Sequence, residues 1–160
     1  MIARNLASLE RRRNRSRRGA ALVEAAISLS VLLTFLIFLL DFSIAAFRSE
    51  ALNYLADRVA RTAAVHGPKA LSSHDGGPWG PITVTTTLSG SGTIANIARR
   101  HGTGLPSDEV TLTVTWPSAS NAAGEPVVVT AEMPWTPSLL RPMTMSILTL
   151  RGVSRQIIVH

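Results

Sequence analysis

A single carboxylate inside a long apolar run limits what this chain can fold into more than any other feature. Glu24 is the only charged residue between Gly19 and Leu40, in a stretch dominated by Leu, Ile, Val, Phe and Ala. The 21 residues from Ala20 to Leu40 are enough to cross about 30 Å of hydrocarbon as one helix. A carboxylate in such a span is energetically costly, and ionisable groups there are by default functional. The sequence therefore predicts a membrane-spanning helix with a functional acid near its start.

The excess positive charge of the chain lies ahead of this span. Residues 1–19 contain seven arginines and one acid, so this leader carries the whole formal net charge of +6. The high isoelectric point therefore describes the leader, and we expect no nucleic-acid partner. By the positive-inside rule, the leader stays in the cytoplasm and the chain after Leu40 is exported. The sequence thus predicts a single-pass protein of the cytoplasmic (inner) membrane, with its C-terminal domain periplasmic or extracellular.

Three interpretations fit a basic leader followed by an apolar span. The first is an uncleaved single-pass anchor. The second is a secretory signal cleaved after Ser43-Ile44-Ala45, although the apolar stretch exceeds the usual 7–15 residues of such signals. A twin-arginine signal at Arg17-Arg18 lacks the usual residues downstream. The third is cleavage on the cytoplasmic side directly after Gly19, which retains the helix and makes Glu24 the fifth residue of the mature chain.

The residues around this third cleavage point resemble those of a known family. The run Arg17-Arg18-Gly19-Ala20-Ala21-Leu22-Val23-Glu24-Ala25-Ala26 is similar to the type IV prepilin signal. It more closely resembles the N-terminal signature of TadE-like minor pseudopilins of the tight-adherence (Tad) pilus system. The similarity continues through Asp41-Phe42 and the alanine- and arginine-rich residues 51–64. Ala25 departs from the pattern, because the family often has phenylalanine at this position.

The resemblance implies roles for three residues. Gly19 would be the last leader residue, because a prepilin peptidase admits no side chain there. Ala20 would become the new N-terminus, whose amine such systems can methylate. Glu24 would pair with the N-terminal amine of a neighbouring subunit, and the alternative is that its carboxylate snorkels to the lipid headgroups.

The same resemblance implies a function and a set of partners. The chain would be a minor pseudopilin that primes or supports assembly of a Tad-type pilus for adhesion, secretion or biofilm formation, either entering the pilus or staying at its base. Its partners would be a prepilin peptidase, other pilin or pseudopilin subunits, the inner-membrane assembly platform and the lipid bilayer. The second hypothesis is an exported binding domain on a permanent or signal-peptidase-cleaved membrane anchor, unrelated to filaments.

The helix is predicted to continue outside the membrane. Residues 42–66 contain no Pro or Gly, and Gly67-Pro68 then supplies a helix stop signal. An apolar stripe at helical spacing lies opposite a polar face that carries an Asp57–Arg61 pair at i,i+4. The stripe consists of Leu52, Leu55, Val59 and Ala63, and the polar face of Glu50, Tyr54, Asp57 and Arg61. Such a stripe needs a partner surface, and a sheet from the C-terminal half is the nearest candidate.

The C-terminal half has the pattern of a small antiparallel sheet. Residues 67–81 hold four glycines and three prolines, as a linker does. Strand-forming runs follow at residues 82–88, 110–116, 126–133, 143–150 and 153–159, with a helical turn at 96–100. The chain has no cysteine, so this half must be held by packing and not by disulfides.

These segments together predict an α+β, pilin-like chain in which a long N-terminal helix packs on a small antiparallel sheet. Its five parts are a leader at 1–19 removed on maturation, a transmembrane helix at 20–40, an exported amphipathic helix at 41–66, a linker at 67–81 and a β-rich exported domain at 82–160.

The sequence offers no convincing catalytic or metal-binding arrangement. Ser72-Ser73-His74-Asp75 lies in a Gly/Pro-rich loop without elbow glycines, and adjacent residues rarely meet as a triad does. Arg99-Arg100-His101 is predicted to be a solvated loop. The four histidines lack the spacing of metal ligands: His66, His74, His101 and His160. We therefore expect a protein that is not an enzyme and that needs no cofactor or metal.

Overall fold

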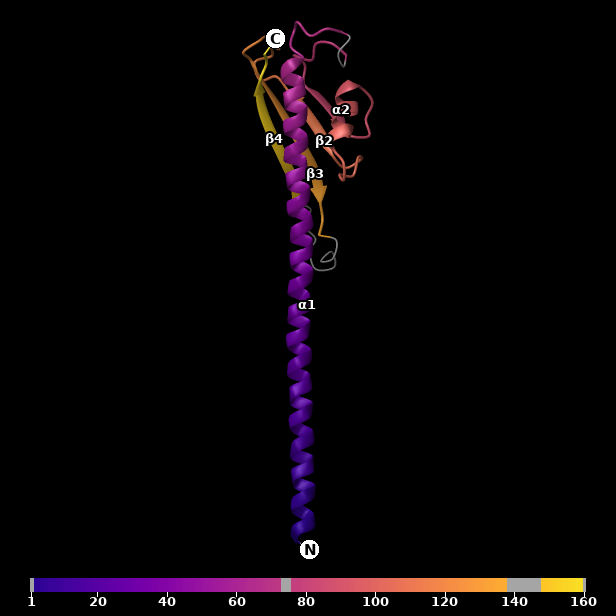
Figure 1. The fold of residues 1–160 in the computed structure, drawn as a ribbon, viewed down its shortest axis with the longest axis vertical. Coiled ribbons are helices and arrows are strands. Elements are labelled where there is room, and N and C mark those ends of the chain that lie inside the picture. The colour runs from indigo at the N-terminus through magenta and orange to yellow at the C-terminus, as the bar shows by residue number, and fades with distance from the viewer. Residues whose placement is uncertain (1, 73–75, 138–147, 160) are drawn as a thin grey trace. The chain divides into compact units, whose positions relative to one another are not determined.

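The computed structural model describes residues 2–72, 76–137 and 148–159, with side chains described from residue 19 onward. Its chain forms two compact units, Met1–Asp41 and Phe42–His160. Over the residues described, two helices and four strands follow one another (Figure 1). They are α1 (Ile2–Val65), β1 (Val84–Thr87), α2 (Thr93–His101), β2 (Thr111–Thr115), β3 (Pro126–Trp135) and β4 (Leu148–Ile157).

The first unit is the N-terminal part of α1. Every side chain from Gly19 to Leu40 is exposed, including large apolar ones such as Leu22 and Phe35. A continuous apolar surface of this size is unfavourable in water. The helical segment Gly19–Val65 is long and apolar enough to cross a membrane, consistent with a single-pass membrane protein.

The second unit is built on a four-stranded antiparallel sheet in the order β1-β2-β3-β4. Each strand pairs with the next along the chain, so the sheet is a simple meander. Burial alternates along β3, with one residue in two turned into the core. The buried residues of β3 are Val127, Val129, Ala131, Met133 and Trp135.

The C-terminal part of α1 covers the buried face of this sheet. The predicted apolar stripe is confirmed, because Leu52, Leu55 and Val59 are fully buried in one cluster with core residues of β2 and β3. The short helix α2 lies beside α1 (Figure 1), and the rings of Tyr54 and His101 meet edge to face at 6.4 Å. The long helix packed on an antiparallel sheet is the predicted α+β architecture.

Two sequence predictions within the sheet domain are corrected. The final strands predicted at 143–150 and 153–159 are one continuous strand, β4, over the residues described, and residues 143–147 lie outside them. Gly152 does not interrupt this strand. A Cβ at this position would stand 2.5 to 2.6 Å from backbone atoms of Leu52 and Asn53, so the glycine lets α1 approach the sheet.

The basic cluster at residues 99–101 is also not a solvated loop. It forms the last turn of α2. The Arg99 side chain donates hydrogen bonds to the backbone carbonyls of Leu88 and Gly90, both at 2.9 Å. Arg99 therefore joins α2 to the end of β1.

Candidate processing and assembly site

The three predicted site residues lie on α1, within its exposed apolar part. Ala20 and Glu24 are one helical turn apart and share a face. A shallow depression runs along this face. It is lined by Gly19, Ala20, Val23, Glu24, Ile27 and Ser28.

Gly19 has no structural role in the part of the chain that the structure describes. A Cβ added at this position would have no heavy atom within 4 Å. Glycine in a helix interior is less favourable than alanine by about 1 kcal/mol. No contact in the described fold accounts for this cost, in contrast to Gly152, where the helix backbone occupies the space.

The Glu24 side chain is exposed on the helix surface. It has no hydrogen-bond or ion-pair partner among the described residues. A carboxylate in a membrane span is stabilised by pairing with a cation, and an unpaired one is penalised. A cation that pairs with Glu24 must therefore come from outside the described helix.

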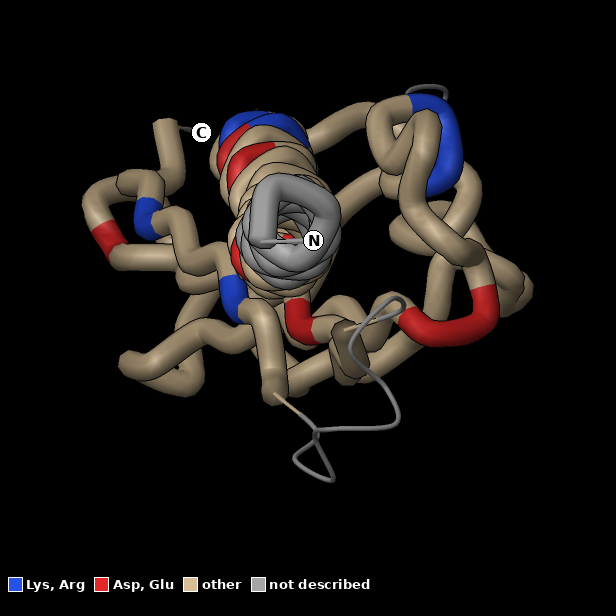
Figure 2. The backbone as a smooth tube through the Cα atoms, turned by 90° about the horizontal axis from the view of Figure 1, so that it is seen from below, with Lys and Arg blue, Asp and Glu red and all other residues tan. Residues whose placement is uncertain are grey.

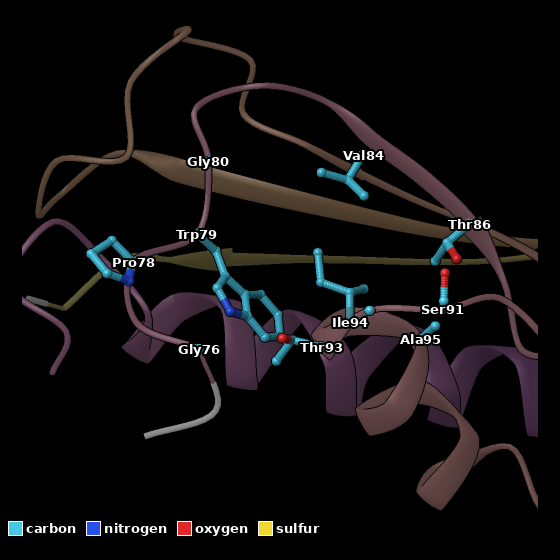
Figure 3. Close-up of a pocket in the computed structure, with 11 residues that line it drawn as sticks. Gly76, Pro78, Trp79, Gly80, Val84, Thr86, Ser91, Thr93, Ile94 and Ala95 are labelled. Atoms are coloured by element: carbon cyan, nitrogen blue, oxygen red, sulfur yellow. The ribbon is translucent and has the colours of Figure 1, made fainter. Parts of the chain in front are cut away.

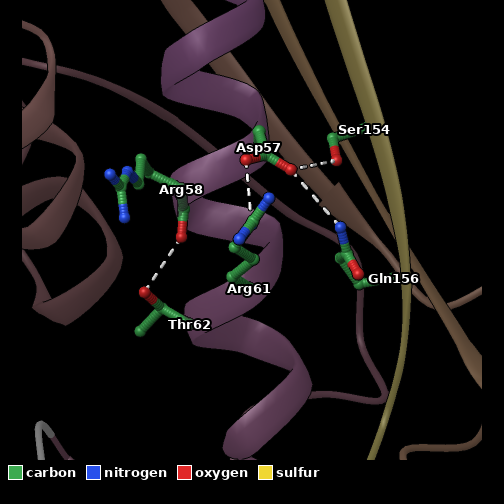
Figure 4. Close-up of polar contacts among 6 residues, drawn as sticks. All are labelled: Asp57, Arg58, Arg61, Thr62, Ser154 and Gln156. Carbon is green, nitrogen blue, oxygen red and sulfur yellow. Dashed lines mark hydrogen bonds and ion pairs between the residues drawn. The ribbon is translucent and has the colours of Figure 1, made fainter.

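A polar cluster built on the predicted Asp57–Arg61 pair joins α1 to β4 (Figure 4). The predicted pair is confirmed, with Arg61 Nε 2.9 Å from Asp57 Oδ2. Ser154 Oγ and Gln156 Nε2 also donate to Asp57 Oδ1, at 3.4 and 3.3 Å. Asp57 therefore positions the amphipathic part of α1 on the edge strand. The sequence carried no signal for the β4 donors, which lie almost 100 residues away from Asp57.

The sheet domain also contains a pocket of about 280 Å³ between residues 76–80, β1 and the start of α2. Trp79, Val84 and Ile94 project into the same space (Figure 3). Trp79 also stacks on His66 with ring centroids 4.6 Å apart. The described side chains that line it are uncharged, so among them there is neither an acid–base pair nor a carboxylate or imidazole ligand for a metal. The lining is mainly apolar, with the hydroxyl groups of Thr86, Ser91 and Thr93 as its polar side chains.

The structure describes the other candidate groups of the sequence in part. Residues 73–75 of the candidate hydroxyl–imidazole–carboxylate run lie outside the described residues. No group of three His, Asp or Glu side chains that could hold a metal occurs in the described part. Basic and acidic residues are intermixed over the described part of the chain, and neither kind gathers on one face (Figure 2).

Residues 19–61 match the family model of TadE-like proteins. The matched segment begins at Gly19, contains Glu24 and ends at Arg61, before the sheet. The match confirms the resemblance inferred from the signature for this part of the chain. Neither a curated protein nor a solved structure gives a significant match.

Proposed function

From the TadE-like segment 19–61, we propose that the chain is a minor pseudopilin that primes or supports assembly of a Tad-type pilus. The pilus would in turn serve adhesion, secretion or biofilm formation. The observation that carries the proposal concerns the described residues, in which Gly19 has no packing role and Glu24, five residues later, is an exposed carboxylate with no partner. Both features are costly in an isolated helix, and recognition by a peptidase and by a neighbouring subunit would account for them.

Maturation is the first step. A prepilin peptidase at the cytoplasmic membrane surface cleaves the peptide bond between Gly19 and Ala20 and frees the Ala20 amine. The absent side chain of Gly19 lets the chain enter the peptidase. The basic leader keeps this bond on the cytoplasmic side, while the sheet domain stands outside the membrane.

Assembly is the second step. The new amine of one subunit and the Glu24 carboxylate of its neighbour form an ion pair among packed helices in lipid. Pairing offsets much of the energetic cost of burying both charges. Removal of one partner leaves the other charge uncompensated, which is destabilising by several kcal/mol. The partners would be other pilin or pseudopilin subunits on the inner-membrane assembly platform.

The experiment separates processing from assembly. In cells that form the pilus, we expect Glu24→Ala to be processed near normally, while crosslinking to other pilin subunits and surface piliation fall. Glu24→Gln should be only slightly better, because its amide accepts a hydrogen bond but offers no charge to the ammonium. Glu50→Ala removes an exposed carboxylate of the sheet-covering part of α1 and is the matched control, expected to behave as wild type.

Normal pilus number and normal crosslinks in Glu24→Ala would contradict the pairing role. Glu24 would then be a carboxylate that snorkels to the headgroups.

A further inference from the structure

The strand β4 leaves a long edge of the sheet open. It is ten residues long and, among the described residues, pairs with β3 alone, whereas the opposite edge strand, β1, has four residues. An edge strand presents unpaired N–H and C=O groups, and proteins commonly shorten or cover such edges. The length of β4 is therefore a feature that needs an explanation.

The hydrogen bonds at the end of β4 show which backbone groups face the open side. Ile158 bonds toward the β3 side, donating to the Glu125 carbonyl at 3.0 Å and accepting from the Gly124 amide at 2.8 Å. The next amide, Val159 N–H, points the other way and donates to the Ala64 carbonyl. Backbone direction alternates along an antiparallel strand. The odd-numbered residues from 149 to 157 therefore direct both N–H and C=O to the open side.

The prolines of β3 support this assignment. Pro126 and Pro134 are the register partners of Ile157 and Thr149. Proline has no N–H to donate, so these two pairs cannot be the doubly bonded pairs of the ladder. In the part of the chain that the structure describes, no other segment bonds to the open side between residues 149 and 157.

The open edge is also positively charged. Arg151 and Arg155 are exposed and flank Val153, which is half exposed. Arg151 lies 3.3 Å from Glu132 across the strands, while Arg155 has no carboxylate partner among the described residues. A second copy paired symmetrically about Val153 would set Arg151 directly opposite Arg155, and like charges in such positions are destabilising.

We propose that the edge of β4 binds an extended, acidic segment of another protein, which adds to the sheet as a fifth strand. Main-chain hydrogen bonds to residues 149–157 supply the affinity, as in other cases of strand addition. Acidic residues four positions apart lie opposite Arg151 and Arg155, with a β-branched residue between them opposite Val153. The proposal does not depend on a role in filaments.

The test uses the full chain in detergent micelles and two synthetic nonapeptides of alternating threonine and valine. One peptide carries two glutamates four positions apart, and its twin carries lysines instead. We expect calorimetry to detect binding of the glutamate peptide and binding about tenfold weaker for the lysine peptide, from the exchange of attractive for repulsive cross-strand pairs. Arg155→Glu should remove this preference, because each peptide then meets one attractive and one repulsive cross-strand pair.

The backbone is tested at Val153. Val153→Pro removes an N–H on the open side and leaves the β3–β4 hydrogen bonds in place, so it should abolish binding of the glutamate peptide. Val153→Ala keeps the N–H and is the matched control for binding and thermal unfolding.

Equal binding of the two peptides, or full binding by a folded Val153→Pro variant, would overturn the proposal. Crosslinked dimers of the chain that Val153→Pro abolishes would also overturn it, by assigning the edge to a second copy. Should Val153→Pro not fold, the Arg155→Glu result decides.

Discussion

Three glycines of this chain differ in whether the described fold requires them. Gly152 gives its space to the backbone of α1. Gly80 has a φ of +83° and lies against the ring of Trp116, so both its conformation and its surroundings exclude a side chain. Gly19 has neither a positive φ nor a neighbour. At the scale of the residue, the glycine that the fold does not explain is the one at the proposed cleavage point.

Substitution of Gly19 should separate folding from processing. We expect Gly19→Val to insert and fold normally, because nothing lies within 4 Å of the new Cβ, yet to keep its leader because the side chain fills space that the peptidase needs empty. Immunoblots of membrane fractions would give the ratio of unprocessed to processed chain. Ala21→Val adds similar bulk two residues further on and should be processed. Normal maturation of Gly19→Val would rule out peptidase recognition of this glycine.

At the scale of the element, α1 packs on the buried face of the sheet, and its contact with β4 determines where the helix lies. The helix backbone meets Gly152, and Asp57 accepts hydrogen bonds from Ser154 and Gln156. Apolar burial of the helix stripe supplies most of the attraction, while the glycine and the polar cluster fix where the helix lies.

Gly152→Ala tests this contact. Gly152 does not have a positive φ, so alanine meets no conformational penalty, but its Cβ would collide with helix backbone that cannot rotate away. We expect a loss of about 2 to 3 kcal/mol in the free energy of unfolding, the usual cost of overpacking. Denaturant unfolding of the full chain in micelles would measure it. A change within about 0.5 kcal/mol of wild type, the range usual for surface substitutions, would contradict the close contact.

Features that depend on local interactions could be predicted from the sequence, whereas features that depend on contacts between distant segments could not. The helix stripe around Leu55 and the first three strands were predicted because they depend on local periodicity. The continuity of β4 through Gly152 and the partners of Asp57 were not, because they depend on contacts between segments about 100 residues apart. Glu24 stands out by its charge within the apolar run, whereas the roles of Gly19 and Glu24 follow from the resemblance to the TadE-like signature and stay predictions. In the structure, no contact among the described residues explains either the missing side chain of Gly19 or the carboxylate of Glu24.

At the scale of the whole molecule, the distribution of charge predicts the orientation in the membrane. The leader holds the net positive charge and the remainder of the chain is balanced. We therefore expect a reporter that is active only in the periplasm to be active when fused after His160. A fusion of the same reporter in front of Met1 is the control and should be inactive. Activity of a cytoplasm-only reporter fused after His160 would show that the orientation is the opposite of the one predicted.

The N-terminal mass of the wild-type protein, extracted from membranes of cells that contain a prepilin peptidase, tests the central claim most directly. Cleavage after Gly19 predicts a mature chain of residues 20–160 that begins at Ala20 and retains Glu24 and the apolar helix. An N-terminus at Met1 would indicate a permanent anchor, and one near Ala46 a secretory signal. Either result would contradict the pseudopilin account.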